Sequence, residues 1–86
     1  MKEENSLTVY GNTWCGGTRR VRSFLERNRV PYRWVDIEVD QQAAQLVEDL
    51  NNGMRSVPTI VWQDGSKLVE PSEKELAEKL GISLVP

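Results

Sequence analysis

The sequence of 86 residues contains no histidine and a single cysteine, Cys15. With one cysteine no disulfide can form within the chain, and without histidine the common Cys/His zinc sites cannot assemble in it. The missing histidine also removes the usual general base, so a nucleophile must be activated by its electrostatic surroundings. A small secreted domain normally needs several disulfides, and we therefore expect a cytoplasmic protein.

Long hydrophobic runs are also absent. Residues 1–5 are polar and acidic with no apolar stretch behind them, so the sequence predicts neither a signal peptide nor a membrane span. Hydrophobic residues make up 38% and charged residues 28% of the chain, which is typical of a globular protein. We expect residues 1–86 to form a single domain, with residues 1–5 as a polar tail.

The net charge of −2 is unevenly distributed. Residues 19–33 carry six arginines against one acid, Glu26, which gives this segment a charge of +5. A pI of about 5.1 argues against a nucleic-acid partner, because proteins that bind nucleic acid are usually basic. The basic segment can instead attract a small anionic substrate, and most of its arginines are interpreted as a solvated helix face.

Hydrophobic periodicity predicts four strands and three helices. The strands are expected at residues 6–10, 32–39, 59–62 and 67–69. The helices are expected from about residue 18 to residue 28, from the N-cap at 40 to the stop at 53, and from the capping box at 72–75 to residue 80. Val35, Ile37 and Val39 are assigned to one face of the second strand.

The buried face of the second helix is predicted to comprise Ala43, Leu46, Val47 and Leu50. The chain opens with a strand–helix–strand unit, which implies a right-handed crossover and parallel pairing of the first two strands. A hairpin at 64–65 then adds an antiparallel edge. The result is an α/β fold, a four-stranded mixed sheet with three flanking helices, which is the thioredoxin-like architecture.

Cys15 falls between the first strand and the first helix, where unpaired backbone N–H groups and the helix dipole favour an anion. Cysteines at helix N-termini titrate as low as about 3.5 to 7.5, compared with about 8.5 for a free cysteine. Arg19 and Arg20 add positive charge, and Gly16 and Gly17 leave the sulfur accessible to another disulfide. We therefore interpret Cys15 as a reactive thiol, because a small buried hydrophobic residue fits a Gly-Gly loop poorly.

The segment from Thr8 to Gly16, TVYGNTWCG, resembles the start of a glutaredoxin, closest to the mycoredoxin-like branch. The similarity continues through Val57–Thr59, Asp64–Ser66 and Glu70–Ser72, with the order and spacing of these blocks kept. The resemblance implies thiol–disulfide oxidoreductase activity with no bound cofactor. It also implies that glutathione or mycothiol serves as the co-substrate.

The sequence departs from the dithiol members of this family at Thr18, where those proteins have a second cysteine. A dithiol enzyme uses that second thiol to resolve the mixed disulfide formed by the first. We therefore predict monothiol chemistry at Cys15, acting on mixed disulfides between proteins and a low-molecular-weight thiol. Thr18 either donates a hydrogen bond to the thiolate or is a first-turn residue without catalytic effect.

The resemblance implies further site residues. Val57 precedes a cis-proline, Pro58, which faces the cysteine in the family, and the Val57 backbone is expected to pair with the substrate. Ser72 lies where the family binds the γ-glutamyl carboxylate of glutathione, although a plain helix cap explains this serine equally well. Glutathione-using members carry a lysine shortly before the cysteine, which this chain lacks. Arg55 or Arg19 is the candidate to replace its charge.

Trp14 and Gly16, on either side of Cys15, complete the predicted substrate-binding set. Trp14 is either a platform for the substrate or a packing residue, and the sequence does not separate the two roles. Trp34 and Trp62 are expected to be sheet residues.

We expect a monomeric enzyme with no nucleic-acid or membrane partner. One alternative is iron–sulfur cluster binding between two protomers, as in monothiol glutaredoxins. Those proteins read Cys-Gly-Phe-Ser and carry the upstream lysine, and this chain has neither feature. Another alternative is a binding module that has kept the fold and lost turnover. Visible absorbance after anaerobic purification would favour the cluster, and an unactivated Cys15 would favour the binding module.

Overall fold

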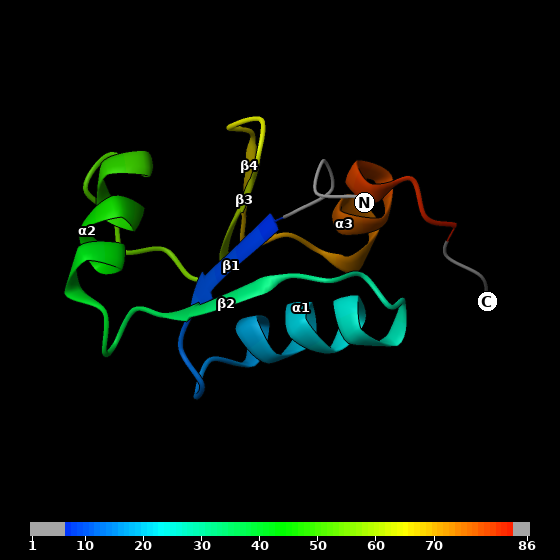
Figure 1. Cartoon of the computed structure of the whole chain (residues 1–86), viewed down its shortest axis with the longest axis horizontal. Coiled ribbons are helices and arrows are strands. Elements are labelled where there is room, and N and C mark those ends of the chain that lie inside the picture. The colour runs from blue at the N-terminus through cyan, green and yellow to red at the C-terminus, as the bar shows by residue number, and fades with distance from the viewer. Residues whose placement is uncertain (1–6, 84–86) are drawn as a thin grey trace.

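The computed structural model describes residues 7–83, and Figure 1 shows how their elements are arranged. The elements are β1 (Leu7–Gly11), α1 (Gly16–Arg27), β2 (Arg33–Asp36), α2 (Gln41–Leu50), β3 (Thr59–Trp62), β4 (Lys67–Val69) and α3 (Glu73–Leu80). The sheet has the order β2-β1-β3-β4, in which β1 is parallel to β2 and the other two pairs are antiparallel. The predicted thioredoxin-like fold is therefore confirmed, while Ser6 and the predicted tail at 1–5 lie outside the described residues.

Different helices cover the two faces of the sheet (Figure 1). On one face, Val9 of β1 and Ile60 of β3 pack against Phe24 of α1 and Leu76 of α3, and all four are fully buried. On the other face, α2 contributes the fully buried Val47 to a second and smaller core. The alternation of side chains along β1 and β3 thus places the sheet between two apolar layers.

The second strand is shorter than predicted. It ends at Asp36, and Ile37 is buried whereas Val39 is 80% exposed, so the prediction that Val39 shares a strand face with Ile37 was wrong. The Asp36 side chain accepts the N–H of Glu38 at 2.9 Å, and its carbonyl accepts the N–H of Asp40 at 3.1 Å. These local bonds replace strand pairing and turn the chain toward α2.

The second helix begins as predicted but buries a different face. Asp40 is its N-cap and accepts the N–H of Ala43 at 3.0 Å. The buried residues are Ala43, Ala44 and Val47. Of the other two predicted residues, Leu46 is 39% exposed and Leu50 is only half-buried, and neither belongs to this core. At about 100° per residue, Leu46 points well away from the centre of the face that the three buried residues define.

α2 ends at Leu50, before the predicted stop at Gly53, whereas both ends of α3 follow their predicted signals. Gly53, with φ of 89°, donates its N–H to Glu48 near the end of α2 at 2.7 Å. Ser72 and Glu75 form the reciprocal capping box that opens α3, and Gly81 ends this helix in the left-handed conformation. None of the helices within residues 7–83 has the length and apolar character needed to cross a membrane.

Gly11, the last residue of β1, lies directly against Thr18 of α1. A Cβ atom at Gly11 would meet Thr18 Oγ1 at 2.6 Å and Cγ2 at 2.8 Å. Thr18 is fully buried, so its side chain has no free space into which to move. This contact sets how closely the first turn of α1 approaches the end of β1.

We expect Gly11→Ala to destabilise the protein by about 1–3 kcal/mol, because the added methyl group overpacks a rigid contact. Gly16→Ala is the matched control, since a Cβ atom there meets only Arg20 Nη1, at 3.7 Å. The control should change stability by no more than about 0.5 kcal/mol. Urea unfolding of both variants measures the difference, and equal stabilities would show that the Gly11 contact is not tight.

Candidate active site

Cys15 is the N-cap residue of α1. Its backbone is extended, with φ of −82° and ψ of 124°, and its carbonyl accepts the N–H of Arg19 at 3.1 Å. The helix therefore begins at Gly16, two residues before the predicted start near Thr18. Glycine is a poor helix former, but the first-turn N–H groups have no partner within the helix, so Gly16 and Gly17 are accepted there. The sulfur consequently lies beside the unpaired amides of the first turn.

The pKa of the Cys15 thiol is lowered from its ordinary value. The backbone N–H of Thr18 has the largest effect, and burial of the sulfur opposes it. The Thr18 side chain and the N–H of Gly17 lower the pKa further, whereas the carboxylate of Glu70 raises it. The main cause is thus the helix end rather than the neighbouring arginines.

Thr18 acts on the thiol chiefly through its backbone. Its side chain is buried against Gly11, and Oγ1 has no partner in strict hydrogen-bond geometry within residues 7–83. The hydroxyl still lies near enough to the sulfur to lower the pKa of Cys15, but less than the Thr18 amide does. Of the two roles considered for the Thr18 side chain, a hydrogen bond from its hydroxyl to the thiolate stays a prediction, while the Thr18 amide has the larger effect on the pKa of Cys15.

A cavity of about 190 Å³ opens at the sulfur. Val57 and Pro58, just before β3, line it, and the peptide bond between them is cis as the resemblance implied. A Cβ atom at Gly17 would lie 3.4 Å from Pro58 Cδ and 3.8 Å from Cys15 Sγ. The fold therefore brings both the thiol and the proline close to Gly17, where a missing side chain leaves room for a substrate.

Arg20 and Glu70 also line this cavity, although the predicted substrate-binding set contained neither. Both residues and Pro71 line a second cavity of about 430 Å³, which extends to Ser72 at the start of α3. A molecule that reaches from Cys15 to α3 therefore passes these two charges. Neither charge has an ion-pair partner among the described residues. The proximity of Glu70 could not be read from the sequence, because it depends on how the β4–α3 loop packs against α1.

The other predicted site residues lie in different places. Ser72 lines the second cavity, but its hydroxyl accepts the N–H of Glu75 at 3.1 Å as a helix cap. Trp14 is 68% exposed, which does not fit a packing role. Arg55 lines neither cavity and is paired with Glu48 at 2.8 Å.

Two of the six arginines in the basic segment make specific contacts with other side chains. Arg22 stacks over the ring of Trp34 at 4.0 Å, and Arg27 pairs with Glu73 of α3 at 3.1 Å. Among the six arginines of residues 19–33, Arg20 is the one that lines both cavities near Cys15. Five of the six arginines are exposed and Arg22 is half-buried, so the predicted solvated face holds for most of this segment.

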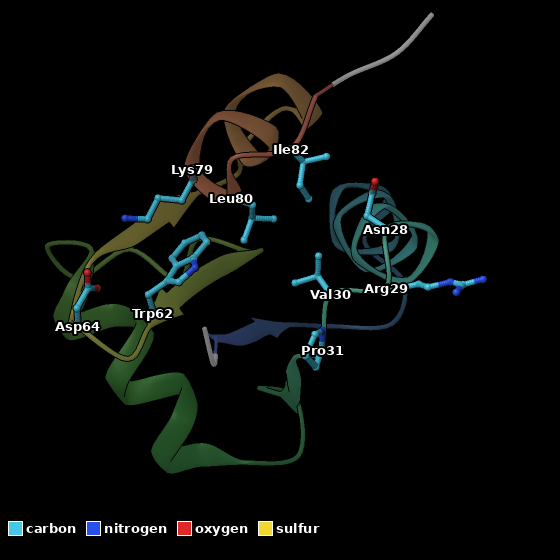
Figure 2. Close-up of a pocket in the computed structure, with 9 residues that line it drawn as sticks. All are labelled: Asn28, Arg29, Val30, Pro31, Trp62, Asp64, Lys79, Leu80 and Ile82. Atoms are coloured by element: carbon cyan, nitrogen blue, oxygen red, sulfur yellow. The ribbon is translucent and has the colours of Figure 1, made fainter. Parts of the chain in front are cut away.

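A larger cavity, of about 490 Å³, lies at the other end of α1 (Figure 2). It is lined by residues 28–31 and by side chains of β3 and α3, among them Trp62 and Lys79, whose ammonium lies 5.0 Å from the indole ring. With a rise of 1.5 Å per residue, the 12 residues of α1 separate this cavity from Cys15 by about 18 Å. Since Cys15 is the only thiol of the chain, this cavity contains no thiol of its own.

Comparisons with known proteins point to one family. The glutaredoxin family model matches residues 7–66. A Mycobacterium tuberculosis protein named "Putative glutaredoxin" is 44% identical over 75 residues, which cover 87% of this chain and 89% of that protein. Mycoredoxin 1 of Corynebacterium glutamicum is 29% identical over 76 residues, covering 88% of this chain and 94% of that protein.

Solved structures agree with this result. A glutaredoxin from Archaeoglobus fulgidus superimposes with a TM-score of 0.74 at 25% identity, covering 88% of this chain and 86% of that chain. A buckwheat glutaredoxin–glutathione complex shares the fold, with a TM-score of 0.65 at 22% identity and coverage of 92% and 73%. The fold and the cysteine site at the first helix place the chain among thioredoxin-fold redox proteins. Within that class, it belongs to the glutaredoxin family.

We expect Cys15 to react as a thiolate at pH values where an ordinary cysteine is protonated, because the helix amides lower its pKa. The midpoint of its alkylation rate against pH should lie clearly below about 8.5. The lowered pKa also stabilises the native state above the unfolded-state pKa, and this contribution is lost as pH falls through the native-state pKa. Cys15→Ser should show neither effect, and a midpoint at or above about 8.5 would contradict the interpretation.

Proposed function

We propose that this protein is a monothiol oxidoreductase that reduces mixed disulfides between proteins and a low-molecular-weight thiol. The observation that carries this proposal is that Cys15, the only cysteine, has a lowered pKa and lies at an open cavity. Its thiolate is a nucleophile, and the chain holds no second thiol to resolve a disulfide with a protein. The protein acts as a monomer in the cytoplasm, where small thiols are kept reduced.

The reaction consists of two thiol–disulfide exchanges. The Cys15 thiolate attacks the small-thiol sulfur of the mixed disulfide, so a bond from Cys15 to the small thiol forms. The protein sulfur leaves as a thiolate and takes a proton from solvent. A second small-thiol thiolate then attacks the small-thiol sulfur bound to Cys15, which releases the Cys15 thiolate and a disulfide of two small thiols. The small thiol thus supplies both electrons.

The cavity beside Cys15 and the cavity beside Ser72 together form a cleft, and its two parts can hold different parts of the substrate. Val57 and Pro58 line the part next to Cys15, where an extended substrate chain can pair with the Val57 backbone. Trp14, exposed beside the cysteine, is available as a platform for the substrate. The part near Ser72 then takes the body of the small thiol.

The charges near Ser72 favour an uncharged small thiol over an anionic one. A helix N-terminus normally attracts a carboxylate, but here the N–H groups of Ser72 and Glu75 are already used by the capping box. Glu75 adds negative charge in the first turn, where Arg27 offsets the charge of Glu73, and Glu70 lines the approach from Cys15 opposite in charge to Arg20. Between the two co-substrates considered, mycothiol has no carboxylate and glutathione has two, so we favour mycothiol.

The wild-type protein should therefore form its mixed disulfide faster with mycothiol disulfide than with oxidised glutathione. Glu70→Gln should raise the glutathione rate by about threefold to tenfold at low salt and change the mycothiol rate much less. Glu78→Gln in α3 is the matched control, because it makes the same charge change outside both cavities. Intact-mass kinetics measure all six rates, and an equal effect of both substitutions would contradict a local role for Glu70.

The monothiol proposal itself predicts that the wild-type protein reduces a small mixed disulfide but scarcely reduces insulin. Thr18→Cys should form an internal bridge to Cys15 and raise insulin reduction about tenfold or more, since a tethered thiol resolves the intermediate efficiently. Thr18→Ser is the matched control without a thiol, and Cys15→Ser should abolish both activities. Efficient insulin reduction by the wild type, or no gain in Thr18→Cys, would refute the proposal.

A further inference from the structure

Asn12 is a buried polar residue to which the mechanism above assigns no role. It lies in the short connection between β1 and α1 and is only 3% exposed. Its side-chain oxygen, Oδ1, accepts the backbone N–H of Cys15 at 2.9 Å. An asparagine that accepts an amide N–H three residues ahead is a local bridge that fixes the intervening turn. Here the residue so fixed is the nucleophile.

The Asn12 side chain binds the backbone N–H of Cys15, which has no partner within the helix. As the N-cap residue, Cys15 contributes its carbonyl to the helix, while its own N–H has no helical partner. The side chain of an N-cap residue faces the amides of the second and third helical residues, which are Gly17 and Thr18. Those two amides are the ones that act on the sulfur. The orientation of the Cys15 backbone therefore decides whether the sulfur meets them.

The position of Asn12 is in turn fixed by its neighbour in the sheet. The carbonyl of Gly11 accepts the N–H of Ile37 at 2.9 Å, beyond the last paired residue of β2. Gly11 also packs directly on the buried Thr18. The end of β1 is thus held by the hydrogen bond from Ile37 and by the contact with Thr18. Asn12 follows directly in the chain, and its hydrogen bond fixes the backbone of Cys15 relative to this strand end.

On the basis of the proposed function, we infer that Asn12 is a positioning residue for the nucleophile. By holding the Cys15 N–H, it keeps the sulfur directed at the amides of Gly17 and Thr18 and exposed to the cavity beside Pro58. Asn12 touches no substrate in this role and acts only through the backbone of Cys15.

The test measures the pH midpoint and the pH 7 rate of Cys15 alkylation in the full chain. Asn12→Ala removes the acceptor and should raise the midpoint and slow the pH 7 reaction by about threefold to tenfold. Asn12→Thr keeps an acceptor oxygen in the same turn and should recover most of the wild-type rate. Asn28→Ala is the matched control, because Asn28 caps the opposite end of α1 by donating Nδ2–H to the carbonyl of Phe24 at 2.8 Å. It should lower Tm without moving the midpoint.

An unchanged midpoint in Asn12→Ala, with a loss of Tm like that of the control, would overturn the inference and leave Asn12 a structural residue only. If Asn12→Ala does not fold, Asn12→Gln replaces it, because the extra methylene displaces the acceptor, and the same criterion applies. A high midpoint in the wild type would instead refute the proposed activation of Cys15, so the two failures are distinguishable.

Discussion

The active site depends on the contact between the sulfur of Cys15 and the backbone amides that open α1. These amides have no partner within the helix, and a thiolate at the N-cap supplies the negative charge that they favour. With no histidine in the chain, this contact replaces the general base that would otherwise activate the thiol. The close packing of Gly11 on Thr18 holds the first turn in place, and the bridge from Asn12 directs the sulfur toward it.

The N-termini of α1 and α3 face the same cleft, but they differ in capping and in charge. At α1 the amides are left for the sulfur of Cys15, and the first turn carries no acidic residue. At α3 the capping box of Ser72 and Glu75 already uses two backbone N–H groups, and a further acid, Glu73, lies in the same turn. The start of α1 thus favours an anion more than the start of α3 does. Glu70 opposes the thiolate only weakly, as the lowered pKa of Cys15 shows.

The local features of the fold that were predicted correctly depend on residues close together in the chain. The caps at Asp40 and Ser72 and the turn before β4 each involve residues within four positions, so their geometry follows from local hydrogen bonding. The errors arose where two local preferences compete. Alternating hydrophobicity predicted that β2 would continue to Val39, but hydrogen bonds to Asp36 end the strand earlier. The local sequence does not show whether strand pairing or hydrogen bonding to Asp36 is the more stable arrangement.

The sequence by itself determined that the chain has one thiol and that this thiol lies at a helix N-terminus, because both facts follow from residue identity and from local spacing. The resemblance to glutaredoxins further implied that Pro58, although distant along the chain, lies beside Cys15. Only the tertiary structure decided that Glu70 and Arg20 flank the cleft, and that Arg55 is paired away from it. These placements depend on how the β4–α3 loop packs against α1 and on which charges find partners. Packing of segments distant in the chain is a property of the whole fold.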